Sequence, residues 1–449
     1  MKRSVLLSIL VVIVLIVSAT ALYWQSTVTP AAPTVRTVTV TSTTTVTTTV
    51  TTTPAPPTPP PVAKEVIKIG VNVPYTGTAA EVGHAMWRGA QLAAKEINEK
   101  GGVYIKELGK RLKIELVLGD TQARPEVGVS AMEKLITDDK VDFICGGIHS
   151  SVAMADMEVA AKYGKIYWLQ QSISDEIIKK IASNPDKYWS IFKSNWNQSA
   201  YALSWKSFNK MLLDKGYIPP KAKISIVAEE TDYGRSNAKD YQRYNEELGF
   251  EIVSLDIPHL DVTDFYPILS KIAASKPHIV LAIFSANIPA GIAFTKQFRE
   301  MNIPAILEAI YYPLRPELVE TAPEASKYIV YQYFPVPKSY GEKFEKSGLF
   351  PGYKATFDDM YSYDSINAFC DALERAGSLD SKKVAEAILQ TKYKGELGMY
   401  GGFNPKTHEG PPDYHPPRTG QIFTDLKSYT VFPDEYKEKD FALPPWFKR

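Results

Sequence analysis

Four short segments that follow predicted strands carry serine, tyrosine and glycine in patterns suited to hydrogen bonding with a small molecule. In the most informative one, Gly146 and Gly147 allow the backbone to approach a ligand, and Ser150 and Ser151 follow. Their hydroxyl groups lie beside the free N–H groups of a predicted helix start, which suits a carboxylate or an amide oxygen. Ser150 could instead only cap this helix, but capping and binding are compatible, and we expect ligand contact.

Serine and tyrosine side chains in two further turns extend this pattern. Ser172 and Ser174 lie at the end of the next predicted strand, where they either share the same end of a ligand or cap the helix that begins at Asp175. Tyr233 precedes Gly234 in another strand-to-helix turn, and its ring and hydroxyl suit contact with a ligand from the opposite side. Ordinary surface packing is the alternative role for Tyr233.

The sequence offers little for catalysis, metal binding or nucleotide binding. His149 lies beside Ser150, but no G-x-S-x-G motif is present, and adjacent residues in a turn point in different directions. None of the 6 histidines forms a helical pair or has nearby partners at metal-ligand spacing. Neither a G-x-G-x-x-G turn nor a phosphate-binding P-loop occurs. We therefore expect no catalytic residues, no metal and no cofactor, and we do not expect an enzyme.

The composition fits a chain with a large core and no attraction for nucleic acid. The 449 residues are 45% hydrophobic and 22% charged, which allows two domains. The 51 Lys and Arg residues nearly balance the 50 Asp and Glu residues, so no long-range field would hold a polyanion. Cys145 and Cys370 lie far apart among apolar residues, and we predict buried thiols rather than a disulfide.

The N-terminus indicates export. A basic pair precedes an uncharged run from Ser4 to Leu22 that is long enough to cross a bilayer. Residues 19–21 would serve as a signal-peptidase site, but the length of the run favours an uncleaved membrane anchor over residues 1–25. Residues 26–64 are almost entirely Thr, Val, Pro and Ala, which predicts an extended stalk. We expect the remainder on the extracellular face of the membrane, or released if the anchor is cleaved.

Strands and helices alternate along the remaining chain. Apolar alternation and short buried runs predict strands, and a period of 3.6 residues predicts the helices between them. This alternation of strands and helices occurs in two sets, the second of which begins near Trp189. The predicted helices include 150–163, 235–248 and 357–376, and the predicted strands include 141–145, 278–284 and 328–333.

This alternation predicts an α/β fold of two doubly wound lobes. Strands that alternate with helices of this length form parallel sheets joined by right-handed crossovers. Two such sheets would leave a ligand cleft at the carboxyl ends of their strands. We expect the first lobe to contain residues 65–190 and 311–418, and the second to contain 191–310 and 419–449.

Several stretches resemble the branched-chain amino acid and amide binding proteins of ABC importers, which share the type I periplasmic binding fold. The resemblance runs from Val66 to the C-terminus and is among its most specific in RGAQLAAKEINEKGG, residues 88–102. Residues 67–83 are similar to that family's opening strand and ligand loop, and 141–151 resemble the segment whose serine holds a ligand carboxylate. Other similar stretches are 118–136, 231–236 and 431–436.

The resemblance implies a role for the candidate serines. Ser150, with nearby backbone groups, and Ser172 with Ser174 would bind the carboxylate end of a ligand, while Tyr233 closes from the second lobe. The loop of residues 74–78 corresponds to the family's first ligand loop. The expected ligand-binding residues are Tyr75, Ser150, Ser151, Ser172, Ser174, Tyr233, Asn287 and Tyr311.

The chain departs from the family where a ligand ammonium group would bind. The acidic partner of the ammonium aligns with Tyr311, and Glu308 could replace it only in a different register. Because a buried ammonium group without a carboxylate partner is costly, ordinary amino acids fit poorly. An amide, a urea-like molecule, a carboxylate without an ammonium group and an aromatic acid remain open.

The resemblance implies a solute-binding receptor that captures a small polar solute, such as an amino acid, amide or carboxylate, between two lobes. We expect the receptor to be a monomer. It would deliver this solute to an ABC permease in the membrane. A ligand-sensing ectodomain of a signalling system is the alternative, and a hydrolytic α/β enzyme is the third possibility.

Overall fold

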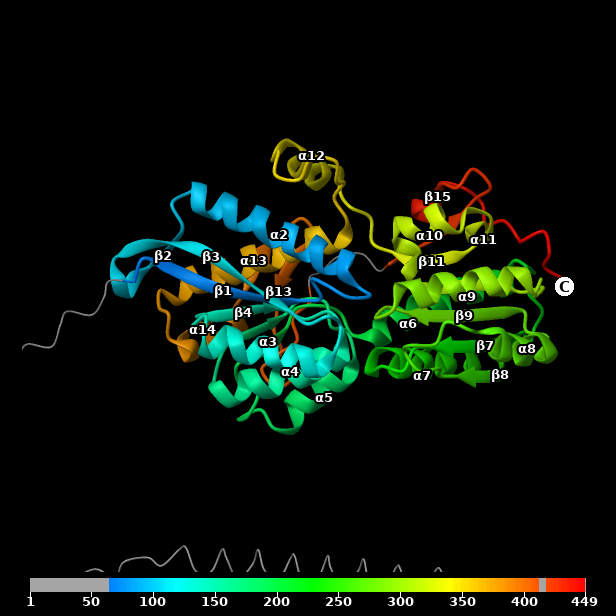
Figure 1. Ribbon diagram of the computed structural model, residues 1–449, viewed down its shortest axis with the longest axis horizontal. Helices are drawn as coiled ribbons and strands as arrows, with labels where there is room; N and C mark the ends of the chain where they lie inside the picture. Colours follow the sequence, from blue (N-terminus) through cyan, green and yellow to red (C-terminus); the bar gives the residue numbers. More distant parts are fainter. Residues whose placement is uncertain (1–63, 412–416, 449) are drawn as a thin grey trace, which may run out of the picture. The chain divides into compact units, whose positions relative to one another are not determined.

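The computed structural model describes residues 64–411 and 417–448, which form two lobes built on separate sheets (Figure 1). The predicted membrane anchor and all but the last residue of the predicted stalk lie outside the described residues. Within the described ranges, no helix combines the length and the apolar character needed to cross a membrane.

The first lobe is built on a six-stranded sheet in the order β2-β3-β1-β4-β5-β6. Neighbouring strands are parallel from β3 to β6, and β2 joins β3 as an antiparallel edge. The strands are β1 (Val66–Val73), β2 (Val103–Ile105), β3 (Lys110–Asp120), β4 (Phe143–Gly146), β5 (Tyr167–Leu169) and β6 (Ile191–Lys193). The helices of this lobe are α2 (Ala80–Glu99), α3 (Pro125–Thr137), α4 (Ser150–Tyr163), α5 (Asp175–Ser183), α13 (Phe357–Ala376) and α14 (Ser381–Leu389).

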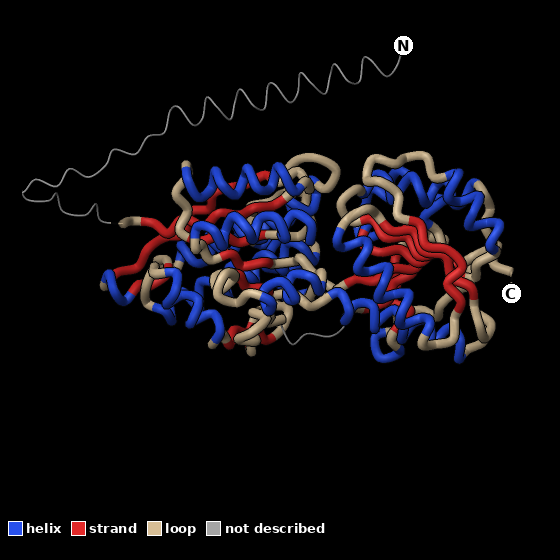
Figure 2. Tube along the Cα trace, turned by 90° about the horizontal axis from the view of Figure 1, so that it is seen from below, coloured by secondary structure: helices blue, strands red, loops and turns tan. Residues whose placement is uncertain are grey.

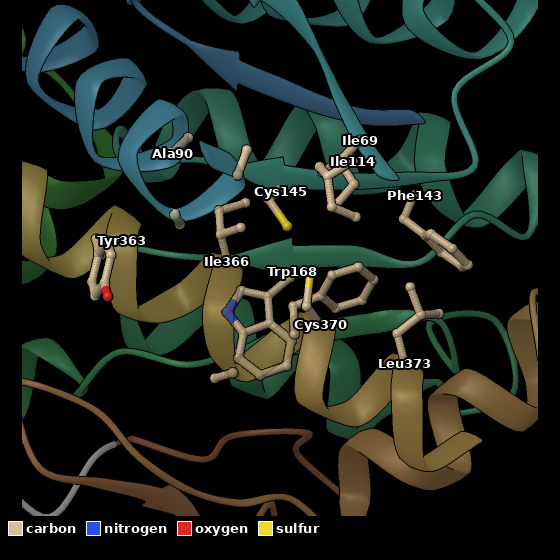
Figure 3. Close-up of a cluster of buried hydrophobic side chains, with 14 of the residues drawn as sticks. Ile69, Ala90, Ile114, Phe143, Cys145, Trp168, Tyr363, Ile366, Cys370 and Leu373 are labelled. Carbon is tan, nitrogen blue, oxygen red and sulfur yellow. The ribbon is translucent and has the colours of Figure 1, made fainter. Parts of the chain in front are cut away.

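Side chains on the two faces of this sheet enter two different cores, because successive residues of a strand point to opposite faces. Cys145 of β4 lies in the core that α2 and α13 cover, whereas its neighbour Ile144 lies in the core under α3, α4 and α5. Figure 3 shows the first core, where Cys145, Trp168 and Cys370 lie close together. Both cysteines are buried free thiols, as the sequence analysis predicted.

Helices α2 and α13 pack against each other at short range (Figure 1). Arg88 of α2 donates from Nε to Oδ1 of Asp359 in the first turn of α13 over 3.0 Å. A capping box begins α13, in which the Thr356 and Asp359 side chains each accept from the other residue's backbone N–H. Gly89 lies at the contact, where the absence of a Cβ allows the backbones to approach.

The second lobe is built on a seven-stranded sheet in the order β15-β14-β11-β10-β9-β7-β8. Its strands run parallel from β8 to β11, and β14 and β15 continue the sheet as antiparallel strands. The strands are β7 (Lys223–Ala228), β8 (Glu251–Asp256), β9 (Ile279–Phe284), β10 (Ile306–Tyr311), β11 (Val330–Tyr333), β14 (Arg418–Ile422) and β15 (Ser428–Phe432). The helices are α6 (Gln198–Asp214), α7 (Asp232–Glu246), α8 (Tyr266–Ser275), α9 (Ile288–Glu300), α10 (Pro316–Thr321) and α11 (Pro323–Ser326).

Strand β9, whose sequence is IVLAIF, is buried along its whole length between two helical layers. Ile279, Leu281 and Ile283 face the core formed with α6 and α7. The residues between them, such as Val280 and Phe284, face the core formed with α8 and α9. Figure 2 shows this sheet between helices on both sides. A fully apolar strand therefore reflects burial on both faces, as is usual for parallel sheets.

The structure confirms the predicted α/β architecture with parallel sheets, but it places one strand differently. The sequence analysis assigned residues 311–418 to the first lobe. Strand β11 instead pairs with β10 and β14 in the second sheet, so the chain returns to the first lobe after Tyr333. The reason is that a short buried strand carries no local pattern that indicates which sheet it joins. Helix α12 (Lys338–Lys346) and the hairpin of β12 (Lys392–Lys394) and β13 (Met399–Gly401) follow.

A buried lysine lies where β6 leaves the first lobe. The Lys193 Nζ is fully buried and donates to the carbonyl oxygens of Asn195 and, over 2.9 Å, Trp196. Its backbone N donates to the carbonyl oxygen of His408 over 2.9 Å. This bond joins the end of β6 to the segment that contains His408. Burial lowers the pKa of Lys193 to about 8. The lysine thus fastens the segment that leads into the second lobe.

We expect Gly89→Ala to destabilise the protein by about 2–3 kcal/mol, because an added Cβ would overpack a backbone contact. That Cβ would lie 1.9 Å from the carbonyl oxygen of Asp359, and a backbone atom cannot move aside as a side chain does. Urea denaturation of the purified protein measures the change. Gly341→Ala in α12 is the matched control, since nothing lies within 4 Å of its added Cβ. Equal stability of both variants would contradict the expected close packing of α2 and α13.

Candidate functional site

A cavity of about 660 Å³, a volume that includes space open to solvent, lies where strand ends and loops of both lobes meet. Most of these segments follow the carboxyl ends of parallel strands, which is where open α/β sheets offer ligand sites. The residues that line it are Ile148, Gln171, Ile173, Asn195, Tyr201, Tyr233, Ser285, Ile310, Tyr311, Leu314, Gln332, Tyr333, Phe334, Phe357 and Pro417.

Aromatic and aliphatic side chains form most of the cavity wall. Phe334 stacks on Phe357 with ring centroids 4.6 Å apart and meets Tyr201 edge-on at 5.4 Å. Among the described residues, the cavity-lining side chains include none that carries a charge. The polar groups are amides and hydroxyls, on Gln171, Asn195, Ser285, Gln332 and the tyrosines. The wall therefore suits a small molecule with a flat apolar body and a few hydrogen-bonding groups.

Two of the predicted ligand-binding residues, Tyr233 and Tyr311, line this cavity. Tyr233 lies in the first turn of α7, which Thr231 caps by accepting from the Gly234 N–H. Burial raises the pKa of both tyrosines, so each phenol stays protonated at physiological pH. Tyr311 ends β10 with a φ of 76°, a left-handed conformation that is uncommon for a residue with a side chain.

The predicted serines lie next to the cavity rather than on its wall. The Ser150 hydroxyl accepts from the Ser174 N–H over 3.2 Å, and the Ser174 hydroxyl caps α5 by accepting from Glu176 N over 3.3 Å. Ser172 is fully buried, and its hydroxyl has no hydrogen-bond partner. The cavity wall at this position consists of their neighbours, Ile148, Gln171 and Ile173.

Three hydrogen bonds join the lobes at the segments that follow β7 and β9, beside the cavity. The Ser151 hydroxyl accepts from the Asp232 N–H over 3.0 Å, and the Thr78 hydroxyl donates to the carbonyl oxygen of Ala286 over 2.6 Å. His149 Nε2 lies 3.3 Å from the carbonyl oxygen of Ser285. Ser151 was predicted to touch a ligand, and in this structure its hydroxyl contacts the opposite lobe.

Tyr75 and Asn287 lie away from the cavity wall. The Tyr75 ring meets the His84 ring edge-on, with centroids 4.6 Å apart. Asn287 caps α9 by accepting from the Ala290 N–H over 3.0 Å and donates to the carbonyl oxygen of Leu260 over 2.7 Å. Both side chains therefore have structural contacts, and their proposed role in ligand binding finds no support in the cavity lining.

A buried carboxylate that sequence reasoning missed holds the loop after β9. Glu229 is 2% exposed and accepts from the backbone N–H groups of Ser285 and Ala286 over 2.8 Å and 2.9 Å. The Ser285 hydroxyl also donates to it, over 2.5 Å. Burial raises the pKa of Glu229. Its position directly before the Thr231–Gly234 turn was the available sequence signal.

An ion pair lies behind the Tyr311 side of the cavity. Arg315 donates from Nη2 to Asp358 Oδ2 over 2.6 Å, and the Tyr311 hydroxyl donates to Asp358 Oδ1 over 3.4 Å. Glu308, the alternative acidic residue, lies elsewhere, buried in the second lobe where the Tyr241 hydroxyl donates to it. Within the described ranges, no three His, Cys, Asp or Glu side chains come together as metal ligands would. The arrangement suits non-covalent capture of a small molecule.

Comparison with known proteins adds independent findings. A model of the family described as periplasmic binding proteins matches residues 66–416. An amino acid binding protein of Pseudomonas aeruginosa is 26% identical over 332 residues, which are 71% of this chain and 81% of that protein.

Solved structures share the fold at low sequence identity. A putative branched-chain amino acid ABC transporter protein of Silicibacter pomeroyi has a TM-score of 0.70 at 23% identity. The match covers 85% of this chain and 100% of that protein's chain. Another match is a solute binding protein of an ABC transporter from R. palustris, solved with benzoate, with a TM-score of 0.66 at 19% identity. It covers 83% of this chain and 99% of that protein's chain.

We expect the buried His149 to make the folded protein less stable as the pH falls. Burial lowers its pKa from 6.5 to about 4, so below pH 6.5 the unfolded chain takes up a proton that the folded protein does not. The contribution present above pH 6.5 should be lost progressively down to about pH 4, by up to about 3 kcal/mol.

Urea denaturation at pH 7.5 and at pH 4.5 measures this loss. Because buried carboxyl groups also titrate, the informative quantity is the difference between the wild type and His149→Gln, which should lose less stability on acidification. His84→Gln, at a side chain that is 34% exposed, is the control and should behave as the wild type. Identical losses in the wild type and His149→Gln would contradict the interpretation.

Proposed function

The chain belongs to the periplasmic binding protein family, as its sequence motifs predicted, and we propose that it binds one small solute in the described cavity and delivers it to an ABC permease. The observation that carries the proposal is the cavity itself, which both lobes line and which hydrogen bonds between the lobes flank. A ligand that touches both lobes favours the closed state, because only that state provides contacts from both sides. The closed form would then dock on the permease.

We further propose that the solute has a flat apolar body and no ammonium group. The aromatic wall supports the flat body, and the uncharged lining supports the absence of an ammonium, which would lose its hydration without gaining a carboxylate partner. The relative from Pseudomonas aeruginosa is named an amino acid binding protein, whereas the R. palustris protein was solved with benzoate. The second kind of ligand agrees better with this cavity.

The proposed carboxylate subsite lies at the Ser150–Ser172–Ser174 side of the cavity. Ser172 supports it, because its buried hydroxyl has no partner in the structure and its neighbours Gln171 and Ile173 line the wall. A ligand carboxylate that approached this side would supply the missing acceptor. Tyr233 and Tyr311 would contact the ligand from the second lobe.

We also propose that residues 1–25 anchor the protein and that residues 26–64 hold the lobes away from the membrane surface. The uncharged run from Ser4 to Leu22 and the Thr/Pro-rich segment after it support this arrangement. An extracytoplasmic position agrees with the family to which the chain belongs.

Calorimetric titration tests the proposed function. Full-length protein, freed of any bound ligand by unfolding and refolding, is titrated with leucine, alanine, acetamide, urea, benzoate and 4-(hydroxymethyl)benzoate. We expect one saturable site for the benzoates and binding to leucine at least about tenfold weaker, which corresponds to about 1.4 kcal/mol. Flat titrations across the whole panel would contradict a binding function, and a preference for leucine would contradict the proposed ligand class.

Cell fractionation tests the proposed anchor. The full-length chain should be recovered with membranes and released by detergent but not by high salt, because a hydrophobic span rather than surface charge holds it. A variant that lacks residues 1–25 and carries a cleavable signal should be soluble after export. Soluble wild-type protein with a shortened N-terminus would show that the segment is a cleaved signal instead.

A further inference from the structure

A buried ion pair lies directly behind one wall of the cavity, although neither partner lines it. The side chains of Arg315 and Asp358 are 5% and 4% exposed, and 2.6 Å separates Arg315 Nη2 from Asp358 Oδ2. Their sequence neighbours Leu314 and Phe357 line the cavity, and so does Tyr311. Each of the two charged residues is therefore the sequence neighbour of a residue that a ligand would touch.

Tyr311 connects this ion pair to the cavity. Its hydroxyl donates to Asp358 Oδ1 over 3.4 Å, and the Arg315 guanidinium lies over its ring at 4.8 Å from the centroid. When the phenol proton points to Asp358, the oxygen lone pairs are what Tyr311 offers to a ligand. Tyr311 is thus a neutral hydrogen-bond acceptor with a balanced pair of charges behind it.

The charge balance depends on Arg315. Asp358 lies in the first turn of α13, where the helix start favours a negative charge, and Arg315 comes from the segment after β10 in the other lobe. Without Arg315, the cavity wall would have an uncompensated carboxylate behind Tyr311. Such a carboxylate is the partner that a buried ammonium group needs.

We propose that Arg315 determines which ligand charge the cavity accepts. By neutralising Asp358, it makes this end of the cavity accept an uncharged hydrogen-bond donor, such as a hydroxyl or an amide N–H, and reject an ammonium group. This inference rests on the proposed function, because it assigns selectivity to the same cavity. Arg315 and Asp358 act through Tyr311 and are positioning residues, whereas Tyr311 contacts the ligand.

Two ligands of the same shape test the proposal, 4-(hydroxymethyl)benzoate and 4-(aminomethyl)benzoate, which differ in a hydroxyl and an ammonium group. The dissociation constant of each is measured with the full-length protein by calorimetry. The wild type should prefer the hydroxyl ligand by at least about tenfold. Arg315→Met, which leaves Asp358 unpaired, should shift this ratio by at least about tenfold toward the ammonium ligand.

Three further variants separate charge selectivity from a structural role. Arg315→Lys keeps the positive charge and should retain the wild-type ratio. The double variant R315M/D358N removes both charges, leaves no unpaired buried charge and should also keep the hydroxyl preference. If Arg315→Met alone does not fold, Tyr311→Phe decides, since it should weaken the hydroxyl ligand by about tenfold and leave 4-methylbenzoate, which has no donor, unchanged. Tyr331→Phe, whose hydroxyl contacts Ser428 outside the cavity, is the matched control.

The outcomes distinguish this inference from the proposed function. If the hydroxyl ligand binds and the ratio of the two ligands' dissociation constants is the same in the wild type and in Arg315→Met, the inference is overturned and the binding function stays intact. A wild type that binds the ammonium ligand equally well, or that binds neither of the two, would also overturn it. The calorimetric panel described above decides independently whether the protein binds a solute.

Discussion

The cavity depends on how the loop after β9 is held from two directions. From within the second lobe, the buried Glu229 carboxylate accepts from the Ser285 and Ala286 N–H groups. From the first lobe, Thr78 donates to the Ala286 oxygen, and His149 lies within hydrogen-bond distance of the Ser285 oxygen. The N–H donors of this short loop thus bond within the second lobe, and its carbonyl acceptors bond to the first lobe. This division of hydrogen bonds couples the interior of one lobe to the surface of the other and fixes one edge of the cavity.

The chemical character of the cavity follows from where the charges lie. Arg315, Asp358 and Glu229 are all close to the cavity-lining residues, yet each forms hydrogen bonds with other protein groups. The groups that reach the cavity are rings, amides and hydroxyls. An uncharged surface of this kind gains little from electrostatic attraction, so shape and a few hydrogen bonds must provide selectivity.

Much of the architecture could be predicted from the sequence, because strong local patterns decide it. The periodicity located α4 and α13 at the residues where the structure has them, and apolar runs located β4 and β9 within two residues. The lobe that contains β11 could not be predicted, since strand pairing is decided by contacts between residues distant in sequence. The same limit applies to the site. Tyr233 was found because it follows a strand in a recognisable turn. Asn195 and Phe334 lie in connecting segments without such a signal, and Phe357 begins α13, where nothing in the sequence indicated a cavity contact. Arg315 and Asp358 are 43 residues apart and meet only in the folded protein.

The two buried thiols of the first lobe have a consequence for how this chain matures. Cys145 and Cys370 are the two cysteines of the sequence, and both are free thiols in the structure. Burial raises the pKa of both, which keeps them in the unreactive thiol form. The two lobes are therefore held together without a disulfide bond. The redox state of the surroundings, whether aerobic or strongly reducing, should leave the native state unchanged.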